Sequence, residues 1–299
     1  MQGLLLLDKS EGATSFKAVS AVKRCAAEKR VGHTGTLDPM ATGVLPILLG
    51  RATALSGLML DADKKYIATV KLGITTDTDD ITGEILSQDE VNITEEQLND
   101  ALLHFKGVIK QTPPMYSAIK KDGVRLYKLA REGKTAYIPE REVEIFDITL
   151  LSGLNNNNEF KIEVHVSKGT YIRSLARDIG KYLGCGATLS TLRRTYASGF
   201  SIDDCIDLSN LSEENIKDYL LSEEIAVAYL PQLNVTQKQA VRFCNGGQLS
   251  FERLHLSDVN DGELFRIKHG DLFLGIGYAD CEKEQIGIKC IINYPKGEK

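Results

Sequence analysis

The spacing of apolar residues along the chain predicts several amphipathic helices. Three segments carry apolar side chains every three or four positions, which places them on one face of a helix. These segments are residues 14–29, 94–105 and 172–183. Thr14 or Ser15 is suited to cap the first helix, and Thr94 with Gln97 forms a capping box for the second. The buried face predicted for the first helix consists of Phe16, Val19, Val22, Cys25 and Ala26.

Other segments alternate apolar and polar residues, as strands with one buried face do. Residues 66–72 and 160–167 follow this pattern. Because helices and strands are mixed without a regular βαβ alternation, the expected fold class is α+β. After Pro231 the pattern changes to a short helix and several strand-like runs, so we expect a larger domain over residues 1–230 and a small, mostly β domain over 231–299. The expected elements of this second domain are a helix at 236–245 and strands at 264–268, 272–278 and 286–294.

Length and composition are those of an ordinary globular protein. The chain has 299 residues, of which 42% are hydrophobic and 26% charged, and this excludes a disordered or coiled-coil chain. No apolar run reaches the roughly 18 residues of a membrane span, and there is no signal-peptide pattern, so we expect a cytoplasmic protein. The six cysteines are dispersed without a CxxC pair, which favours reduced thiols over a zinc site.

Charge is segregated along the chain although the net value is only −5. Residues 106–134 hold eight Lys or Arg against two acids, whereas residues 77–100 hold nine acids and no Lys or Arg. The basic stretch is either a solvated face that pairs with the acidic one or a local surface for a polyanion. The acidic run 77–80 lacks the spacing of a calcium loop and is interpreted as a solvated turn. In the helix at 172–183 the apolar stripe leaves Arg173, Arg177 and Lys181 on a polar face.

Residues 31–46 contain too many glycines, prolines and hydroxyl residues for a regular element, which predicts a structured loop. Asp38 in this loop either organises backbone N–H groups or presents a carboxylate to a pocket. No Gly-Lys-Ser/Thr sequence follows, and no GxGxxG motif opens a helix here, so the loop is not expected to cradle a nucleotide triphosphate.

The stretch GHTGTLDPMATGVLP at residues 32–46 resembles the catalytic loop of the TruB family of tRNA pseudouridine synthases. Further blocks similar to that family follow in the same order over roughly residues 3–200. They include the opening LDK motif, the DKKY motif, the TPPMYSAIK stretch and the SKGTYIRSL stretch, which lie at residues 7–9, 63–66, 112–120 and 167–175, with a last block at 189–194.

This resemblance implies an isomerase with the pseudouridine synthase fold, a mixed and mainly antiparallel sheet with surrounding helices and a central cleft. The enzyme would convert uridine 55 in the T loop of tRNA to pseudouridine without a metal or other cofactor. Residues 106–142 would be an insertion that grips RNA, and residues 231–299 a PUA-like RNA-binding domain. The expected partner is tRNA, bound by a monomer that needs no protein partner and no membrane.

The resemblance also assigns roles to individual residues. Asp38 would be the nucleophile and Arg173 its neighbour, because an adjacent guanidinium lowers a carboxyl pKa. Tyr66 would stack on the target base and is a candidate to remove the C5 proton. The expected substrate-binding residues are His33, Tyr171, Leu192 and Lys9.

Three other interpretations remain open on the sequence alone. The chain could be a non-catalytic RNA-binding or tRNA-folding protein, which would have no need of Asp38. It could be a metal-dependent phosphohydrolase centred on residues 77–80, or a synthase guided by a separate RNA with partner proteins. Activity on a bare transcript, with and without a chelator, distinguishes these cases.

Overall fold

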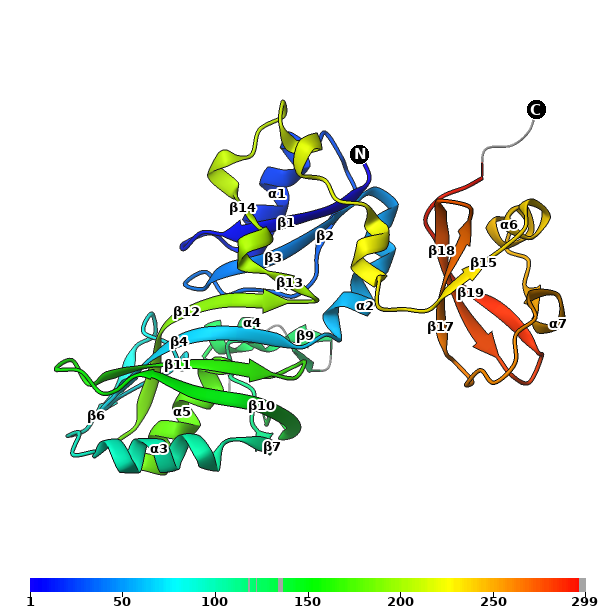
Figure 1. Ribbon diagram of the computed structural model, residues 1–299. Helices are drawn as coiled ribbons and strands as arrows, with labels where there is room; N and C mark the ends of the chain where they lie inside the picture. The colour runs from blue at the N-terminus through cyan, green and yellow to red at the C-terminus, as the bar shows by residue number, and fades with distance from the viewer. Residues whose placement is uncertain (118, 122, 134–136, 296–299) are drawn as a thin grey trace.

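A computed structural model describes residues 1–117, 119–121, 123–133 and 137–295. A ten-stranded sheet forms the larger part of the molecule, with the path β14-β1-β3-β12-β4-β11-β10-β7, β2 paired to β3 and β13 paired to β12 (Figure 1). Its strands are β1 (Gly3–Lys9), β2 (Val31–His33), β3 (Thr42–Leu49), β4 (Lys64–Leu72), β7 (Gly107–Gln111), β10 (Arg141–Ser152), β11 (Glu159–Val166), β12 (Ala187–Ala197), β13 (Phe200–Ser201) and β14 (Ile206–Asp207). The pairs β1/β14 and β3/β12 are parallel and the others antiparallel, which confirms the mixed, mainly antiparallel sheet.

The alternating segments form neighbouring strands at the centre of this sheet. β4 lies between β11 and β12, with Tyr66 opposite Val164 on one side and Arg194 on the other. The apolar positions of β4 and β11 are buried as the alternation predicts; they are Tyr66, Ala68, Val70, Leu72, Phe160, Ile162, Val164 and Val166.

The three long helices predicted for this domain are present as α1 (Ser15–Cys25), α3 (Glu95–His104) and α5 (Ile172–Leu183). Thr14 caps α1, and Thr94 and Gln97 form the expected capping box of α3. One prediction for α1 is wrong: Phe16 is 76% exposed, and the buried face consists of Ser15, Ala18, Val19 and Val22. The reason is a long-range contact, since the Ser15 hydroxyl is bonded to the backbone of Leu37 and turns that face inward.

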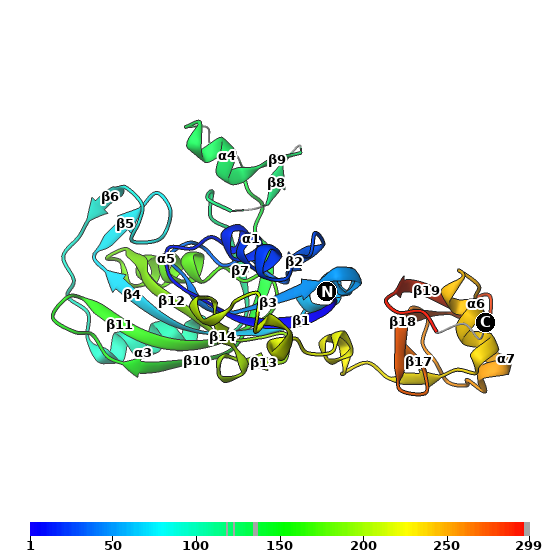
Figure 2. The same cartoon turned by 90° about the horizontal axis from the view of Figure 1, so that it is seen from above.

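Shorter elements connect or extend the sheet. The small hairpin β5/β6 carries the acidic turn, and the hairpin β8/β9 with α4 projects away from the sheet (Figure 2). Residues 118, 122 and 134–136 of the expected 106–142 insertion, Lys134 among them, lie outside the described residues. The bounds are η1 (Gly50–Leu55), α2 (Ser56–Leu60), β5 (Ile74–Thr76), β6 (Ile85–Gln88), β8 (Lys120–Lys121), β9 (Val124–Arg125), α4 (Leu126–Arg131), η2 (Ile202–Asp204), η3 (Leu208–Asn210), η4 (Ile216–Tyr219) and η5 (Glu223–Val227).

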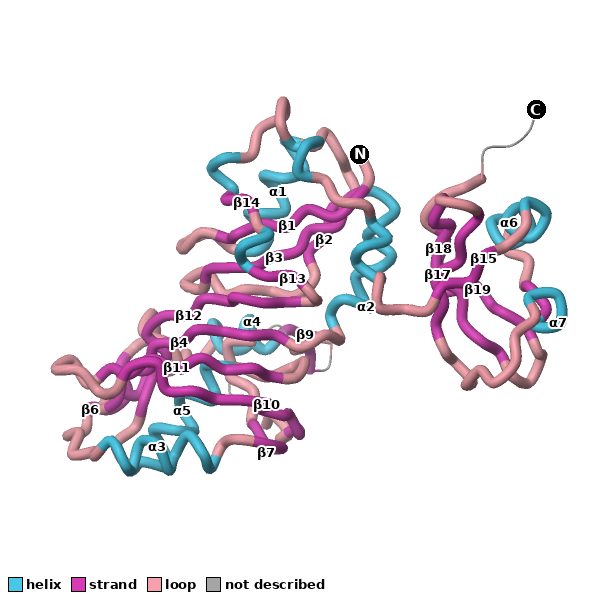
Figure 3. Tube along the Cα trace, viewed as in Figure 1, coloured by secondary structure: helices cyan, strands magenta, loops and turns pink. Residues whose placement is uncertain are grey.

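A five-stranded sheet in the order β15-β17-β18-β19-β16 forms a small, mostly β C-terminal part, as the turn-rich pattern predicts (Figure 3). Apolar side chains of this part pack with those of β1 and β3 in one buried cluster that includes Leu4, Leu48, Phe273 and Ile276. No helix in the described ranges is long and apolar enough to cross a membrane. The elements are β15 (Gln232–Asn234), α6 (Gln237–Cys244), β16 (Leu249–Ser250), α7 (Phe251–Leu254), β17 (Leu264–His269), β18 (Leu272–Asp280) and β19 (Gln285–Ile291).

Candidate active site

Asp38 lies in the irregular connection between β2 and β3, as the composition of residues 31–46 predicts. Its backbone C=O accepts a hydrogen bond from the N–H of Ala41, which turns the chain toward β3. The Asp38 side chain is about one-third exposed. The Asp38 carboxylate is therefore partly accessible to solvent, and in the described residues it is not bonded to the backbone N–H groups of the turn.

Arg173, in the first turn of α5, forms an ion pair with this carboxylate. Its Nε atom lies 2.9 Å from Oδ2 of Asp38, although the N–H is not directed along a hydrogen bond. Its other nitrogens donate to the carbonyl oxygens of Thr78 (2.9 Å) and Tyr116 (2.8 Å). Arg173 is only 4% exposed and lies beside Asp38, the neighbour that the family resemblance implies for it. Segments distant in sequence close over this turn of α5, which helical periodicity cannot show.

Asp80 is a second carboxylate beside Arg173, and the solvated turn predicted for residues 77–80 is wrong at this position. Asp80 is 5% exposed, and its Oδ2 lies 3.6 Å from Nη1 of Arg173. Its Oδ1 accepts hydrogen bonds from the backbone N–H and the hydroxyl of Thr82. A bridge between Asp80 and Leu189 attaches the turn to β12, so the burial depends on tertiary structure. The acidic run was the only sequence signal for this residue.

Burial and charge act in opposite directions on Asp38. Burial raises the pKa of the Asp38 carboxyl above its usual value, the Arg173 guanidinium lowers it, and the Asp80 carboxylate raises it. The net pKa is raised. Without Arg173, burial would raise the pKa of Asp38 further, and a larger fraction of the carboxyl would be protonated.

Lys9 is fully buried on β1 beneath the same loop. Its ammonium group donates to the carbonyl oxygens of Ala13 (2.6 Å), Ser10 (3.0 Å) and Pro39 (3.4 Å). Burial lowers the pKa of Lys9 from 10.5 to about 8, and the negative charge of Asp38 opposes this shift. Lys9 therefore supports the residue next to Asp38 through its backbone.

Tyr66 and Leu192 are buried in adjacent central strands and belong to the same apolar cluster as Leu37, the residue before Asp38. His33 ends β2 at the start of the loop, and its Nδ1 atom is buried without a hydrogen-bond partner among the described residues. Burial lowers the pKa of His33, and the positive charge of Arg194 lowers it further.

Tyr171 is the N-cap residue of α5, two positions before Arg173. The amide of the fully buried Gln111 fixes its backbone: the Tyr171 N–H donates to Oε1 (2.8 Å), and Nε2 donates to the Tyr171 carbonyl (3.0 Å). The guanidinium of Arg141 lies 4.7 Å from the centre of the Tyr171 ring. Sequence patterns did not single out Gln111 or Arg141 for these contacts.

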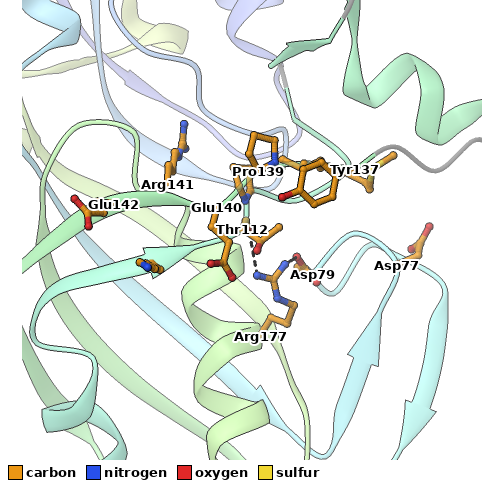
Figure 4. Close-up of a pocket in the computed structure, with 13 residues that line it drawn as sticks. Asp77, Asp79, Thr112, Tyr137, Pro139, Glu140, Arg141, Glu142 and Arg177 are labelled. Carbon is orange, nitrogen blue, oxygen red and sulfur yellow. Dashed lines mark hydrogen bonds and ion pairs between the residues drawn. The ribbon is translucent and has the colours of Figure 1, made fainter.

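A cavity of about 810 Å³ lies beside the next turn of α5 (Figure 4). Arg177 lines it and is held by Oδ2 of Asp79 (2.9 Å) and the carbonyl of Thr112 (3.0 Å). The exposed ring of Tyr137 faces the same space, which combines charged, apolar and aromatic lining. Asp79 directly precedes Asp80, and Arg177 follows Arg173 by one turn of α5. The cavity therefore adjoins the ion pair of Asp38 and Arg173.

The described residues contain no group of three or more His, Cys, Asp or Glu side chains arranged to hold a metal ion. The six cysteines are free thiols. Burial raises the pKa of the Cys205 thiol to about 12, so it is not a reactive thiolate.

Two protein-family models match the chain. A family model described as "TruB family pseudouridylate synthase (N terminal domain)" matches residues 23–172, and one described as "tRNA pseudouridylate synthase B C-terminal domain" matches residues 173–233. The tRNA pseudouridine synthase B of Shewanella pealeana is 41% identical over 292 residues, which cover 93% of this chain and 90% of that protein. The Clostridium tetani protein of the same name is 40% identical and covers 97% and 99% of the two chains.

A solved structure, "Crystal Structure of a Cbf5-Nop10-Gar1 Complex", has a chain that aligns with a TM-score of 0.73 and 27% identity. The alignment covers 98% of this chain and 84% of that chain. The extent and identity of the matches to the curated proteins establish the relationship: the chain belongs to the TruB family of pseudouridylate synthases.

Proposed function

We propose that this protein converts the uridine at position 55 in the T loop of tRNA to pseudouridine, with Asp38 as the nucleophile. The observation that carries the proposal is the ion pair between the partly exposed Asp38 carboxylate and the buried Arg173 guanidinium, 2.9 Å apart. A protein that only binds RNA has no need of a partly buried carboxylate whose charged form a rigidly held arginine favours. Membership of the TruB family supports the same reaction.

The reaction breaks the N1–C1′ bond of the uridine, turns the released base, and forms a C5–C1′ bond. The C5 proton is lost, N1 gains a proton, and nothing is oxidised or reduced. The ionised Asp38 attacks either C6 of the base or C1′ of the ribose, or it assists departure of the base to leave a glycal-like sugar. Each route requires the charged form of Asp38, which Arg173 favours.

Tyr66 is proposed to stack on the target base and to accept the C5 proton after the new bond has formed. The enzyme must take this base out of its stack, at a cost of a few kcal/mol. Stacking on an aromatic ring returns about 1–3 kcal/mol, so one buried tyrosine offsets much of that cost. Leu192 and Tyr171 are proposed to line the pocket, His33 to contact the RNA and help hold the target base out of the RNA loop, and Lys9 to support the site.

RNA flanking the target is proposed to occupy the cavity beside Arg177 and to be gripped by residues 106–142. The aromatic ring of Tyr137 offers a stacking surface there, and the basic groups Lys110, Arg141 and Arg177 line the cavity together with the acids Asp77, Asp79, Glu140 and Glu142. Most of the positive charge for phosphates is proposed to come from the eight Lys or Arg of residues 106–134, and this local concentration lets an acidic protein bind RNA.

The proposal extends to the rest of the molecule. Residues 1–230 form the catalytic domain, and residues 231–299 form a PUA-like RNA-binding domain. The protein acts in the cytoplasm as a monomer on tRNA and needs neither a guide RNA nor a protein partner.

One experiment tests the activity directly. The purified chain is incubated with a bare T-loop transcript whose uridines are tritiated at C5, and tritium release is followed by mapping of pseudouridine. We expect release from one uridine at position 55, unchanged by excess chelator. No release from the bare transcript rejects the proposal, and release only when partner proteins and a guide RNA are added supports the RNA-guided alternative.

A further inference from the structure

Side chains outside the Asp38 loop hold its backbone at both ends and next to the aspartate. The closest of these supports is Ser15, the first residue of α1, which is 3% exposed. Its Oγ accepts a hydrogen bond from the N–H of Leu37 (2.9 Å) and donates one to the carbonyl of Leu37 (3.0 Å). One hydroxyl thus satisfies both polar backbone groups of the residue that precedes Asp38.

Arg194 on β12 supports the two ends of the same loop. Its Nε donates to the carbonyl of Val44 (2.7 Å), and its Nη2 donates to the carbonyl of Gly35 (3.2 Å). A Cβ built on Gly43 would lie 2.1 Å from the carbonyl oxygen of Arg194, so the start of β3, where the loop ends, packs directly against this part of β12. The planar guanidinium bonds both carbonyls at once, whereas the single ammonium group of a lysine would not reach both.

The burial of Arg194 is unusual for a charged residue. It is 1% exposed and makes no ion pair with an Asp or Glu among the described residues. Buried charges are costly unless hydrogen bonds compensate them, and the bonds that compensate this one go to the backbone of the loop. Burial is the largest cause of the lowered pKa of Lys9 and of Lys64, and the positive charge of Arg194 lowers both further.

We propose that Ser15 and Arg194 are positioning residues that set the location of the Asp38 carboxylate relative to Arg173 and the target uridine. This inference rests on the function proposed above. Neither side chain is expected to touch substrate; both act through the loop backbone. A displacement of about 1 Å at a reacting group can reduce a rate by about 100-fold. Loss of one hydrogen bond to the loop backbone should therefore lower the measured rate of the chemical step.

The test compares Ser15→Ala with Ser20→Ala in the full-length protein. Ser20 lies on the same helix, and within the described part of the chain its hydroxyl bonds only to the carbonyl of Phe16 in the preceding turn. Single-turnover rates are measured with enzyme in excess over T-loop RNA, together with the dissociation constant for that RNA. We expect Ser15→Ala to slow the chemical step by about 10- to 100-fold with unchanged RNA affinity, and Ser20→Ala to match the wild type.

Conservative variants separate positioning from folding. Ser15→Thr retains the hydroxyl and is expected to restore most of the rate lost in Ser15→Ala. Arg194→Lys keeps the charge but cannot bond both ends of the loop, so it is expected to lose rate as Arg194→Met does. A wild-type rate for Ser15→Ala at a temperature where it remains folded overturns the proposal, even if its melting temperature falls. Absence of pseudouridine with the wild-type chain is a separate result that rejects the proposed function instead.

Discussion

The guanidinium of Arg173 lies against the carboxylate of Asp38, with Nε 2.9 Å from Oδ2, and it is held there by contacts that do not involve Asp38. Two backbone carbonyls, of Thr78 and Tyr116, fix its remaining nitrogens. The positive charge is therefore in place before any ligand binds, and little reorganisation is needed to stabilise the aspartate.

The first prediction concerns the nucleophile. Asp38→Asn retains the size of the side chain but removes the negative charge that attacks the substrate. We expect it to bind T-loop RNA like the wild type and to lose pseudouridine formation by more than about 1000-fold. Tritium release and RNA affinity are the two measurements. Turnover by Asp38→Asn near the wild-type rate would remove the nucleophile assignment.

The second prediction concerns Asp80, whose charge raises the pKa of Asp38. In Asp80→Asn that pKa is expected to fall, because a nearby negative charge disfavours ionisation. The acid limb of the pH profile of kcat/KM should then move to lower pH. The plateau value of kcat/KM should fall, because Arg173 loses its contact with the Asp80 carboxylate. The profile is measured from tritium release across the acidic and neutral range.

Asp207→Asn is the matched control for Asp80. Its Oδ1 also accepts bonds from the N–H and hydroxyl two residues later, those of Ser209, but no arginine among the described residues pairs with it. Its profile should coincide with that of the wild type. A shift of the acid limb to higher pH in Asp80→Asn contradicts the electrostatic argument.

The third prediction concerns the cavity beside Arg177. If RNA flanking the target stacks on Tyr137, Tyr137→Ala should weaken RNA binding by about 10-fold or more. The single-turnover rate at saturating enzyme should stay at the wild-type value, because the ring is proposed to bind RNA outside the reacting base. Tyr219→Ala, at another exposed tyrosine, is the control. Equal dissociation constants for the two variants would show that RNA does not use this ring.

The fourth prediction concerns stability. Gly43 has φ +107°, and its added Cβ would overlap the backbone of Arg194. Gly43→Ala is therefore expected to lower the free energy of unfolding by at least about 3 kcal/mol. Gly12 has φ +77° but open space around it, so Gly12→Ala should cost only about 1–2 kcal/mol. Urea unfolding followed by circular dichroism measures both, and equal losses would contradict the packing argument.

Local periodicity predicted the helices and strands well because one side of each element is buried over several turns or residues. The strands β4 and β11 and the capping box of α3 are found where the pattern places them. Periodicity failed where a distant segment covers a position: Ser15 and not Phe16 faces inward on α1. The same cause buries Asp80, which the acidic pattern placed in a solvated turn, and Arg173, which lies on the polar face of its helix.

The sequence by itself determined the fold class, the irregular loop that carries Asp38, and the family resemblance, because these depend on residue types and spacing along short stretches. Only the tertiary structure decided which charged groups meet. Arg173, Asp38 and Asp80 come from α5, the β2–β3 loop and the β5–β6 turn, and the folded sheet brings these three segments together. An ion pair between residues far apart in the chain has no local signature, since its geometry depends on how every intervening strand packs.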